Sequence, residues 1–249
     1  MKLLNTTFAS SADNLACDEA LLNWAEIGGG ESLRFWESRE YFVVVGYANK
    51  VEMEVKVATC KMSNVPIFRR CSGGGTVLQG PGCLNYTLVL QIAGHSSLAV
   101  ISGANKFIME RNREAVQSVM ANDQSAISVC GHTDLTLVTR HSSPVASQKF
   151  SGNSQRRQKR ALLFHGTFLL NFKLALMDKF LRMPSKQPDY RNNRSHTDFL
   201  TNLNLPAARL KNAMATVWNA AEEMRDCPEQ EINRLAMEKY STEKWNFKL

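Results

Sequence analysis

The segment IFRRCSGGGTVLQGPGCLNYTLVL, residues 67–90, places a glycine-rich loop between two apolar stretches. Residues 67–70 and 84–90 have side chains typical of half-buried strands, so the segment predicts a strand, a turn and a second strand. The spacing of the glycines matches neither the P-loop nor the dinucleotide-binding fingerprint, both of which lead into a helix. We therefore expect this loop to lie between strands of a sheet.

On either side of this segment, helical and strand patterns alternate. Towards the N-terminus, apolar residues between 15 and 25 fall on one helical face behind the capping residues Ser10, Ser11 and Asp13. Towards the C-terminus, prolines punctuate a mostly helical third. The other expected elements are helices near 52–60 and at 97–120, strands at 33–36, 42–45, 135–139, 149–151 and 161–171, and polar loops at 140–148 and 187–196. Together they predict an α+β domain with a mixed, mostly antiparallel sheet flanked by helices.

The composition is that of a globular protein. Of the 249 residues, 44% are apolar and 21% are charged, which suffices for a core without covalent staples. The six cysteines are scattered without a CxxC pair, so they indicate reduced thiols rather than a zinc site or disulfide framework. The N-terminus shows no signal peptide or membrane span, and we expect a cytoplasmic protein. The net charge of +7 favours an anionic partner, such as a nucleotide, a nucleic acid or an acidic protein.

The glycine-rich loop is the first candidate site. Gly73, Gly74 and Gly75 let the backbone approach a ligand closely and present N–H groups to an anion. Arg70 beside them can add a bidentate contact to a phosphate or carboxylate. For this loop alone, a flexible hairpin turn is the simpler interpretation.

A strand beginning at Lys149 runs into a basic cluster. The Lys149 ammonium can bridge an acyl carboxylate and a phosphate and stabilise negative charge as it builds, although surface lysines are commoner. The cluster Arg156, Arg157, Lys159 and Arg160 is either a solvated face or a surface that steers an acidic partner.

Two further groups have a chemical and a structural interpretation each. His165-Gly166-Thr167 interrupts an apolar strand, which indicates either a close approach of the backbone to a ligand or a satisfied core histidine. Cys130 precedes Gly131 and is either an activated nucleophile or a small buried hydrophobe.

The order of these motifs is more specific than any one of them. RRCSGGG, QGPGCLNY, GHTDL, KFSGNSQRR and HGTFLLN follow one another, and in this order the chain resembles the lipoate–protein ligase and octanoyltransferase superfamily. The resemblance includes the N-terminal NLACDEALL and the final LAMEKYSTEKWNFKL. It implies the fold of a biotin/lipoate ligase catalytic domain, as one domain over residues 1–249 without the small C-terminal accessory domain of many ligases.

The resemblance also implies residue roles. A ligase would activate lipoate or octanoate with ATP and Mg²⁺ to an acyl-adenylate and transfer the acyl group to a lysine. The acceptor would be an acidic lipoyl carrier domain or a glycine-cleavage H-type protein, and Lys149 would be the catalytic contact to carbonyl and phosphate. The residues expected around nucleotide and acyl chain are Arg70, Ser72, Gly73, Gly74, Gly75, Gln79, Gly82, Asn85, Asn153, His165, Gly166 and Thr167.

Departures from the family pattern keep other functions open. Gln79-Gly80 stands where many ligases have His-Asp. The segment QGPG resembles the HGPGQ of one octanoyltransferase group. That group has a cysteine in a later Pro-Cys-Gly segment, which has no counterpart here. A second transferase group places its cysteine upstream of the lysine strand, where Cys130 lies closer to the following Asp-Leu pair than expected. The alternatives are ATP-independent octanoyl or lipoyl transfer through a Cys130 acyl-enzyme, or nucleic acid binding by a basic domain. The basic cluster at 156–160 lacks the interleaved aromatic residues on which nucleic acid bases would stack. A ligase without the accessory domain would need a separate accessory protein. We expect no membrane partner.

Overall fold

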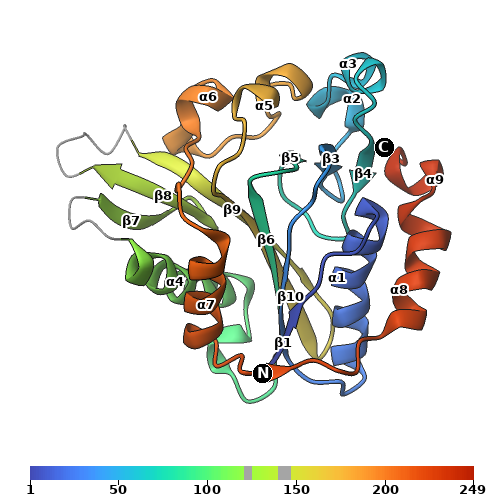
Figure 1. The fold of residues 1–249 in the computed structure, drawn as a ribbon, viewed down its shortest axis with the longest axis vertical. Helices are drawn as coiled ribbons and strands as arrows, with labels where there is room; N and C mark the ends of the chain where they lie inside the picture. Colours follow the sequence, from blue (N-terminus) through green and yellow to red (C-terminus); the bar gives the residue numbers. More distant parts are fainter. Residues whose placement is uncertain (121–124, 140–146) are drawn as a thin grey trace.

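The computed structural model describes residues 1–120, 125–139 and 147–249. Within these ranges a large sheet has the order β11-β1-β2-β6-β10-β9-β8-β7, and a small sheet has the order β4-β3-β5 (Figure 1). In the large sheet β1 pairs in parallel with β2 and β11, and the other pairs are antiparallel. The strands are β1 (Lys2–Asn5), β2 (Ser32–Trp36), β3 (Phe42–Val45), β4 (Ile67–Arg69), β5 (Val77–Gln79), β6 (Cys83–Gln91), β7 (Ser125–Cys130), β8 (Asp134–Thr139), β9 (Gln148–Arg157), β10 (Ala161–Leu169) and β11 (Glu222–Glu223).

Helices cover both faces of the large sheet. Figure 1 shows α4 and α7 on one side of it and α1, α8 and α9 on the other. The helical segments are α1 (Ser11–Glu26), α2 (Val51–Glu54), α3 (Val57–Met62), η1 (Ser96–Leu98), α4 (Ile101–Val119), α5 (Ala175–Phe180), η3 (Asp189–Arg191), α6 (His196–Phe199), α7 (Ala207–Val217), α8 (Glu229–Leu235), η4 (Ala236–Tyr240) and α9 (Glu243–Asn246). The predicted fold class, a mostly antiparallel sheet flanked by helices, is confirmed.

The central strands have apolar side chains on both faces because both faces are covered. Leu88 and Leu162 pack in the core beneath α4 and α7, whereas Val89 and Leu163 pack in the core beneath α1 and α8. Successive residues of a strand point to opposite faces, which explains the unbroken apolar runs of β6 and β10. A third core lies between the small sheet and α2, α3, α5 and α6.

Some elements differ from the sequence prediction. The strand expected at 149–151 extends over β9 as far as Arg157, and strands β1, β5, β7 and β11 were not predicted. The helix expected near 52–60 is two short helices, α2 and α3. The polar loop expected at 187–196 contains η3 and ends at the first residue of α6, and its Arg191 and His196 are buried. Most of the other predicted loop, 140–148, lies outside the described residues.

None of the helices in the described ranges is long and apolar enough to cross a membrane.

Candidate active site

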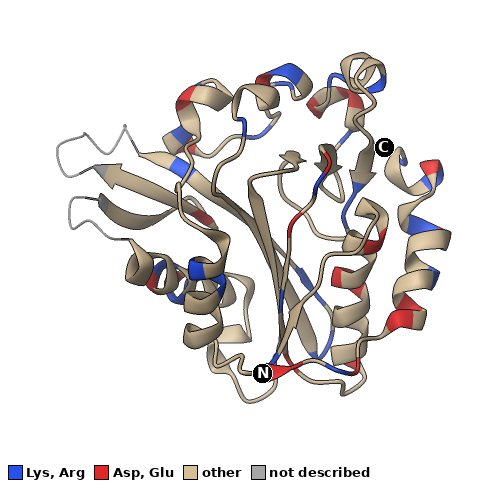
Figure 2. Ribbon diagram, viewed as in Figure 1, with Lys and Arg blue, Asp and Glu red and all other residues tan. Residues whose placement is uncertain are grey.

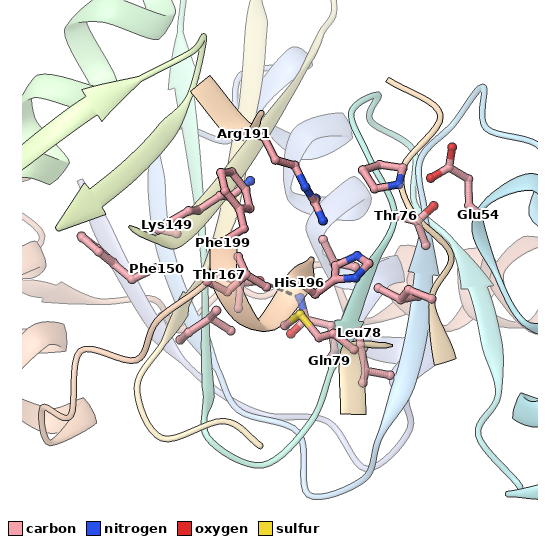
Figure 3. A pocket seen from close by; sticks show the side chains of 18 of the residues that line it. Glu54, Thr76, Leu78, Gln79, Lys149, Phe150, Thr167, Arg191, His196 and Phe199 are labelled. Carbon is pink, nitrogen blue, oxygen red and sulfur yellow. Dashed lines mark hydrogen bonds between the residues drawn. The ribbon is translucent and has the colours of Figure 1, made fainter. Parts of the chain in front are cut away.

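A large cavity opens where the two sheets meet. We call it the main cavity; its volume is about 690 Å³, and its wall comes from α1, both sheets, the glycine-rich loop and the segment leading to η3. A smaller side cavity of about 100 Å³ adjoins it (Figure 3) and is lined mainly by apolar side chains of β5, β10, α5 and α6. The residues that line both are Thr76, Val77, Gln79, Lys149, Gly152, Thr167, Pro184, Arg191 and Phe199. This shared wall is the junction of the two cavities.

The glycine-rich loop is held by the arginine that precedes it. The Arg70 Nε donates to Ser72 Oγ (3.1 Å), and its Nη2 donates to the carbonyl of Gly75 (2.7 Å). Arg70, Gly74 and Gly75 line the main cavity, whereas Ser72 is buried behind it and Gly73 is exposed outside it. Burial lowers the pKa of Arg70 to about 10. Because several of its N–H groups are bonded to the loop, Arg70 holds the loop backbone in place as well as facing the cavity.

A buried hydrogen-bonded chain begins behind this loop. Ser72 Oγ donates to His165 Nε2 (2.5 Å), and His165 Nδ1 donates to Asp18 Oδ2 (2.9 Å). The proton lies on Nδ1 because the carboxylate of Asp18 can only accept. Asp18 Oδ1 is 2.7 Å from Arg34 Nη1. Burial alone would raise the pKa of Asp18, but the hydrogen bond from His165 and the charge of Arg34 outweigh it and lower that pKa. Asp18 and His165 line the main cavity.

Asp18 and Arg34 were not among the sequence candidates. A signal for them exists: each is a charged residue inside an apolar pattern, one on the buried face of α1 and one in the middle of β2. A charge in such a place needs a buried partner.

Polar side chains of the central strands form a second network. Gln79 Nε2 donates to Thr167 Oγ1 (2.6 Å), which donates to Asn85 Oδ1 (2.6 Å). Among the described residues the buried atoms Gln79 Oε1 and Asn85 Nδ2 have no partner. Buried polar atoms are seldom left unpaired, so these two atoms are candidates for bonding a polar ligand in the main cavity, which both residues line.

Asn153 is the third amide at the cavity. Its Oδ1 accepts from the Tyr86 hydroxyl (2.7 Å), and a Cβ on Gly166 would lie 1.6 Å from this oxygen. Gly166 is therefore required by the packing of Asn153 against β10. Gly82 has the same kind of role outside the cavity: its φ is +91°, and a Cβ there would lie 2.3 Å from the carbonyl oxygen of Asn171.

Lys149 stands at the junction and is already paired. Its Nζ is 2.8 Å from Asp134 Oδ1, and the other carboxylate oxygen accepts from the Tyr190 hydroxyl at 2.7 Å. Burial raises the pKa of Tyr190, and the charge of Asp134 and its hydrogen bond with the Tyr190 hydroxyl add to this effect. The sequence prediction that Lys149 faces the site agrees with this geometry, but Asp134 and Tyr190 were not predicted with it.

Cys130 lies on the strand next to Asp134, one partner of this ion pair. It is the cross-strand partner of Asp134 at the β7–β8 turn, and directly paired residues point to the same face of a sheet. Its Sγ is 3.3 Å from Thr136 Oγ1, and it is half-buried. The next residue, Gly131, lines the main cavity, whereas Cys130 itself does not.

The described residues contain no group of three or more His, Cys, Asp or Glu side chains that could hold a metal ion. The carboxylates facing the main cavity are Asp18, Asp134 and Asp189, of which the first two are engaged by basic partners. A magnesium ion would therefore fit here as part of a nucleotide–metal complex rather than as a resident ion.

The sequence analysis gave thirteen candidate site residues, counting Lys149. Ten of them line the main cavity, and Ser72, Gly73 and Gly82 do not. The ten come from the glycine-rich loop, three strands of the large sheet and one of the small sheet. A cavity of this size with convergent amides, two lysines (Lys149 and Lys186) and a backbone loop has the features of a small-molecule binding site.

Comparison with known proteins identifies the family. Residues 10–218 match the catalytic domain of the lipoyl protein ligase A/B family, so the chain belongs to this family of ligases and acyltransferases. The chain is 24% identical to "Octanoyltransferase LipM" of Halalkalibacterium halodurans, with 95% of each protein covered.

Two solved structures show the same fold. A bi-partite lipoate protein ligase from Thermoplasma acidophilum, studied with its E2 lipoyl domain, gives a TM-score of 0.81 at 21% identity, with 99% of this chain and 95% of that chain covered. A lipoate-protein ligase A bound with ATP gives 0.74 at 22% identity, with coverage of 99% and 98%.

Proposed function

We propose that the protein transfers an octanoyl or lipoyl group to a lysine of a lipoyl carrier domain, with Lys149 as the group that stabilises charge on the acyl carbonyl. The observation that carries this proposal is the position of the Lys149 ammonium at the junction of two cavities, one of which has mainly apolar walls. An acyl chain gains about 0.8 kcal/mol for each methylene that it buries. A cation at the chain's polar end would neutralise the oxyanion that forms during transfer.

For the acyl donor we favour a thioester, with Cys130 as the nucleophile. The full-length similarity to an octanoyltransferase supports this route, as does the place of Cys130 beside the Lys149–Asp134 pair. In the first step the Cys130 sulfur bonds to the donor carbonyl, and the donor thiol leaves with the proton. In the second step the amine of the carrier lysine bonds to that carbonyl, and Cys130 leaves and is protonated again.

Trapping the acyl-enzyme tests this route. The protein is mixed with an octanoyl thioester without acceptor, and its intact mass is measured. Wild type should gain one octanoyl group and Cys130→Ser none. Cys227→Ser, which removes the other half-buried thiol, should gain it as wild type does. An octanoyl adduct that persists in Cys130→Ser would refute the thiol route.

ATP-dependent ligation is the second candidate, because the main cavity is large enough to hold a nucleotide beside an acyl chain. In this route the acyl carboxylate attacks the α-phosphorus of ATP, pyrophosphate leaves, and the carrier amine later displaces AMP. Likeness to the ATP-bound ligase supports it. Because the Thermoplasma ligase of similar fold is bi-partite, this route would include a second subunit. Lipoate-dependent pyrophosphate release, unaffected by Cys130→Ser, would establish this route instead.

A further inference from the structure

Arg191 is a buried cation at the junction of the two cavities. It ends the short η3 turn, is only 5% exposed, and lines both cavities. Figure 3 shows its guanidinium extending into the junction towards His196. The segment that carries it was expected to be a polar loop, so no role was predicted for it.

The guanidinium of Arg191 has few protein partners. Its Nε donates to the carbonyl of Arg194 (3.1 Å), and its Nη2 is 3.7 Å from the sulfur of Met183, a weak acceptor. One face stacks on the Phe199 ring, 4.8 Å from its centre. Within the described ranges no carboxylate forms an ion pair with it. Most of its five N–H groups are thus left for a ligand.

The neighbouring carboxylates are engaged by other groups. Asp134 is bound by Lys149 at 2.8 Å and by the Tyr190 hydroxyl, and Asp178 accepts from His196 Nδ1 at 2.7 Å. Burial lowers the pKa of Arg191, and the attraction of Asp178 does not restore it. The junction therefore holds one neutralised cation, Lys149, and one cation whose charge is not compensated.

Arg194 on the same segment shows what a purely structural arginine does here. It stacks against the same Phe199 ring, 5.1 Å from the centre, but donates to the carbonyls of Ser147 and Tyr190 as well as that of Arg191. Arg194 thus holds the segment together. Arg191 has no comparable set of carbonyl partners, and burying a charge without a partner is costly.

We infer that Arg191 binds a phosphate ester of the acyl donor at the junction, next to Lys149. A guanidinium presents paired N–H groups that fit two phosphate oxygens. This inference rests on the proposed acyl transfer and names a recognition group for its donor. The phosphate ester is that of an acyl-adenylate if ATP activates the acid, or that of a 4′-phosphopantetheine arm if the donor is a carrier thioester.

Calorimetric titration at fixed ionic strength tests the inference. The probes are AMP for the first source, 4′-phosphopantetheine for the second, and uncharged octanamide for the acyl pocket. We expect Arg191→Met to weaken the phosphate probe about 10- to 100-fold, because a charged hydrogen bond is lost, and to leave octanamide binding unchanged. Arg225→Met, which removes an exposed arginine, should change neither affinity by more than about twofold.

The probe that binds wild type identifies the source of the phosphate. If neither binds, or if Arg191→Met keeps the phosphate affinity within twofold, the inference is wrong. If Arg191→Met also abolishes octanamide binding, Arg191→Lys serves as the second variant. A lower affinity of Arg191→Lys for the phosphate probe, with unchanged affinity for octanamide, supports the inference. An unchanged affinity for the phosphate probe overturns it. Failure of acyl transfer with intact probe binding would reject the proposed function and not this site.

Discussion

Gly152 is the residue that keeps the space of Lys149 open. A Cβ at position 152 would lie 2.8 Å from Lys149 Nζ and 2.9 Å from its Cε, closer than such atoms pack. The lysine is flexible and would move, which would break or stretch its ion pair with Asp134. The strand itself would remain, because this contact involves only the end of one side chain.

We therefore predict that Gly152→Ala lowers acyl transfer about 100-fold by misplacing the ammonium, with little change in the melting temperature. Steady-state transfer rates and thermal unfolding measure the two effects. Full activity in a folded Gly152→Ala protein would mean that the position of Lys149 does not matter for the reaction.

Gly74 tests the glycine-rich loop. Its φ is +83°, and a Cβ would lie 3.0 Å from Arg70 Nη2. Gly74→Val should therefore both strain the backbone and fill space beside the loop, and we expect donor affinity to fall by at least tenfold. Calorimetry with the donor analogue measures this fall. An unchanged affinity would remove the loop from the binding site.

The sequence predicted residues that line the main cavity, but it did not predict most of the hydrogen bonds between them. Lys149, Asn153 and His165 were predicted and line the cavity. Asp134 and Arg191 were not, because only the folded β7–β8 turn and the η3 segment bring them to the junction. A single sequence contains no distances, so partners far apart in the chain stay hidden unless they break a pattern.

At the scale of elements, the prediction succeeded where periodicity was strong. Helix α1 begins at the predicted cap, with Ser10 Oγ accepting from the backbone of Asp13 at 3.0 Å, and β6 and β10 follow their apolar runs. Strand β9 was predicted too short because its second half is polar. Asn153 and Ser154 of this half face the cavity, whereas Gln155 and Arg157 donate to carbonyls of α4 and η1.

Helix α1 is anchored to the large sheet through a buried ion pair. Arg34 on β2 is fully buried and contacts Asp18 at 2.7 Å, the side chain of Asn14 and the backbone of α1. Arg34→Met should lower the free energy of unfolding by about 3–5 kcal/mol, because it leaves a buried carboxylate without its charged partner. Urea denaturation of the two proteins measures the difference. A loss below about 1 kcal/mol would show that the pair contributes no more than an exposed one.

The same ion pair makes stability depend on pH. The pKa of Asp18 is lowered in the folded state, so its contribution is present above the unfolded pKa of about 3.9 and disappears as pH falls through the folded value. Unfolding free energies of wild type and Asp18→Asn, measured from about pH 7 downwards, should therefore converge in acid. A constant gap between the two curves would contradict the lowered pKa.

At the scale of the whole molecule, charged residues lie mostly on helices and loops, and basic and acidic ones are interleaved (Figure 2). The basic run predicted as one face divides in two. Arg156 donates to the carbonyl of Cys71 and Arg157 to that of Leu98, whereas Lys159 and Arg160 are exposed at the β9–β10 turn. Only the latter two are available to steer a partner.

We predict that Lys159→Ala with Arg160→Ala slows association with an acidic carrier domain several-fold at about 0.01 M salt and has no effect near 1 M salt, where charges are screened. Stopped-flow mixing measures the rate. Equal rates for wild type and variant at low salt would mean that this turn is a solvated surface.

The mass of a lipoyl carrier domain, measured after incubation with the protein, tests the central claim most directly. One sample contains an octanoyl thioester, another contains lipoate, ATP and Mg²⁺, and each is repeated with Lys149→Ala. We predict an acyl-sized mass gain on the carrier from at least one donor, reduced at least about 100-fold by Lys149→Ala. No gain from either donor, or an equal gain with the folded Lys149→Ala protein, would contradict the claim that this junction transfers acyl groups through Lys149.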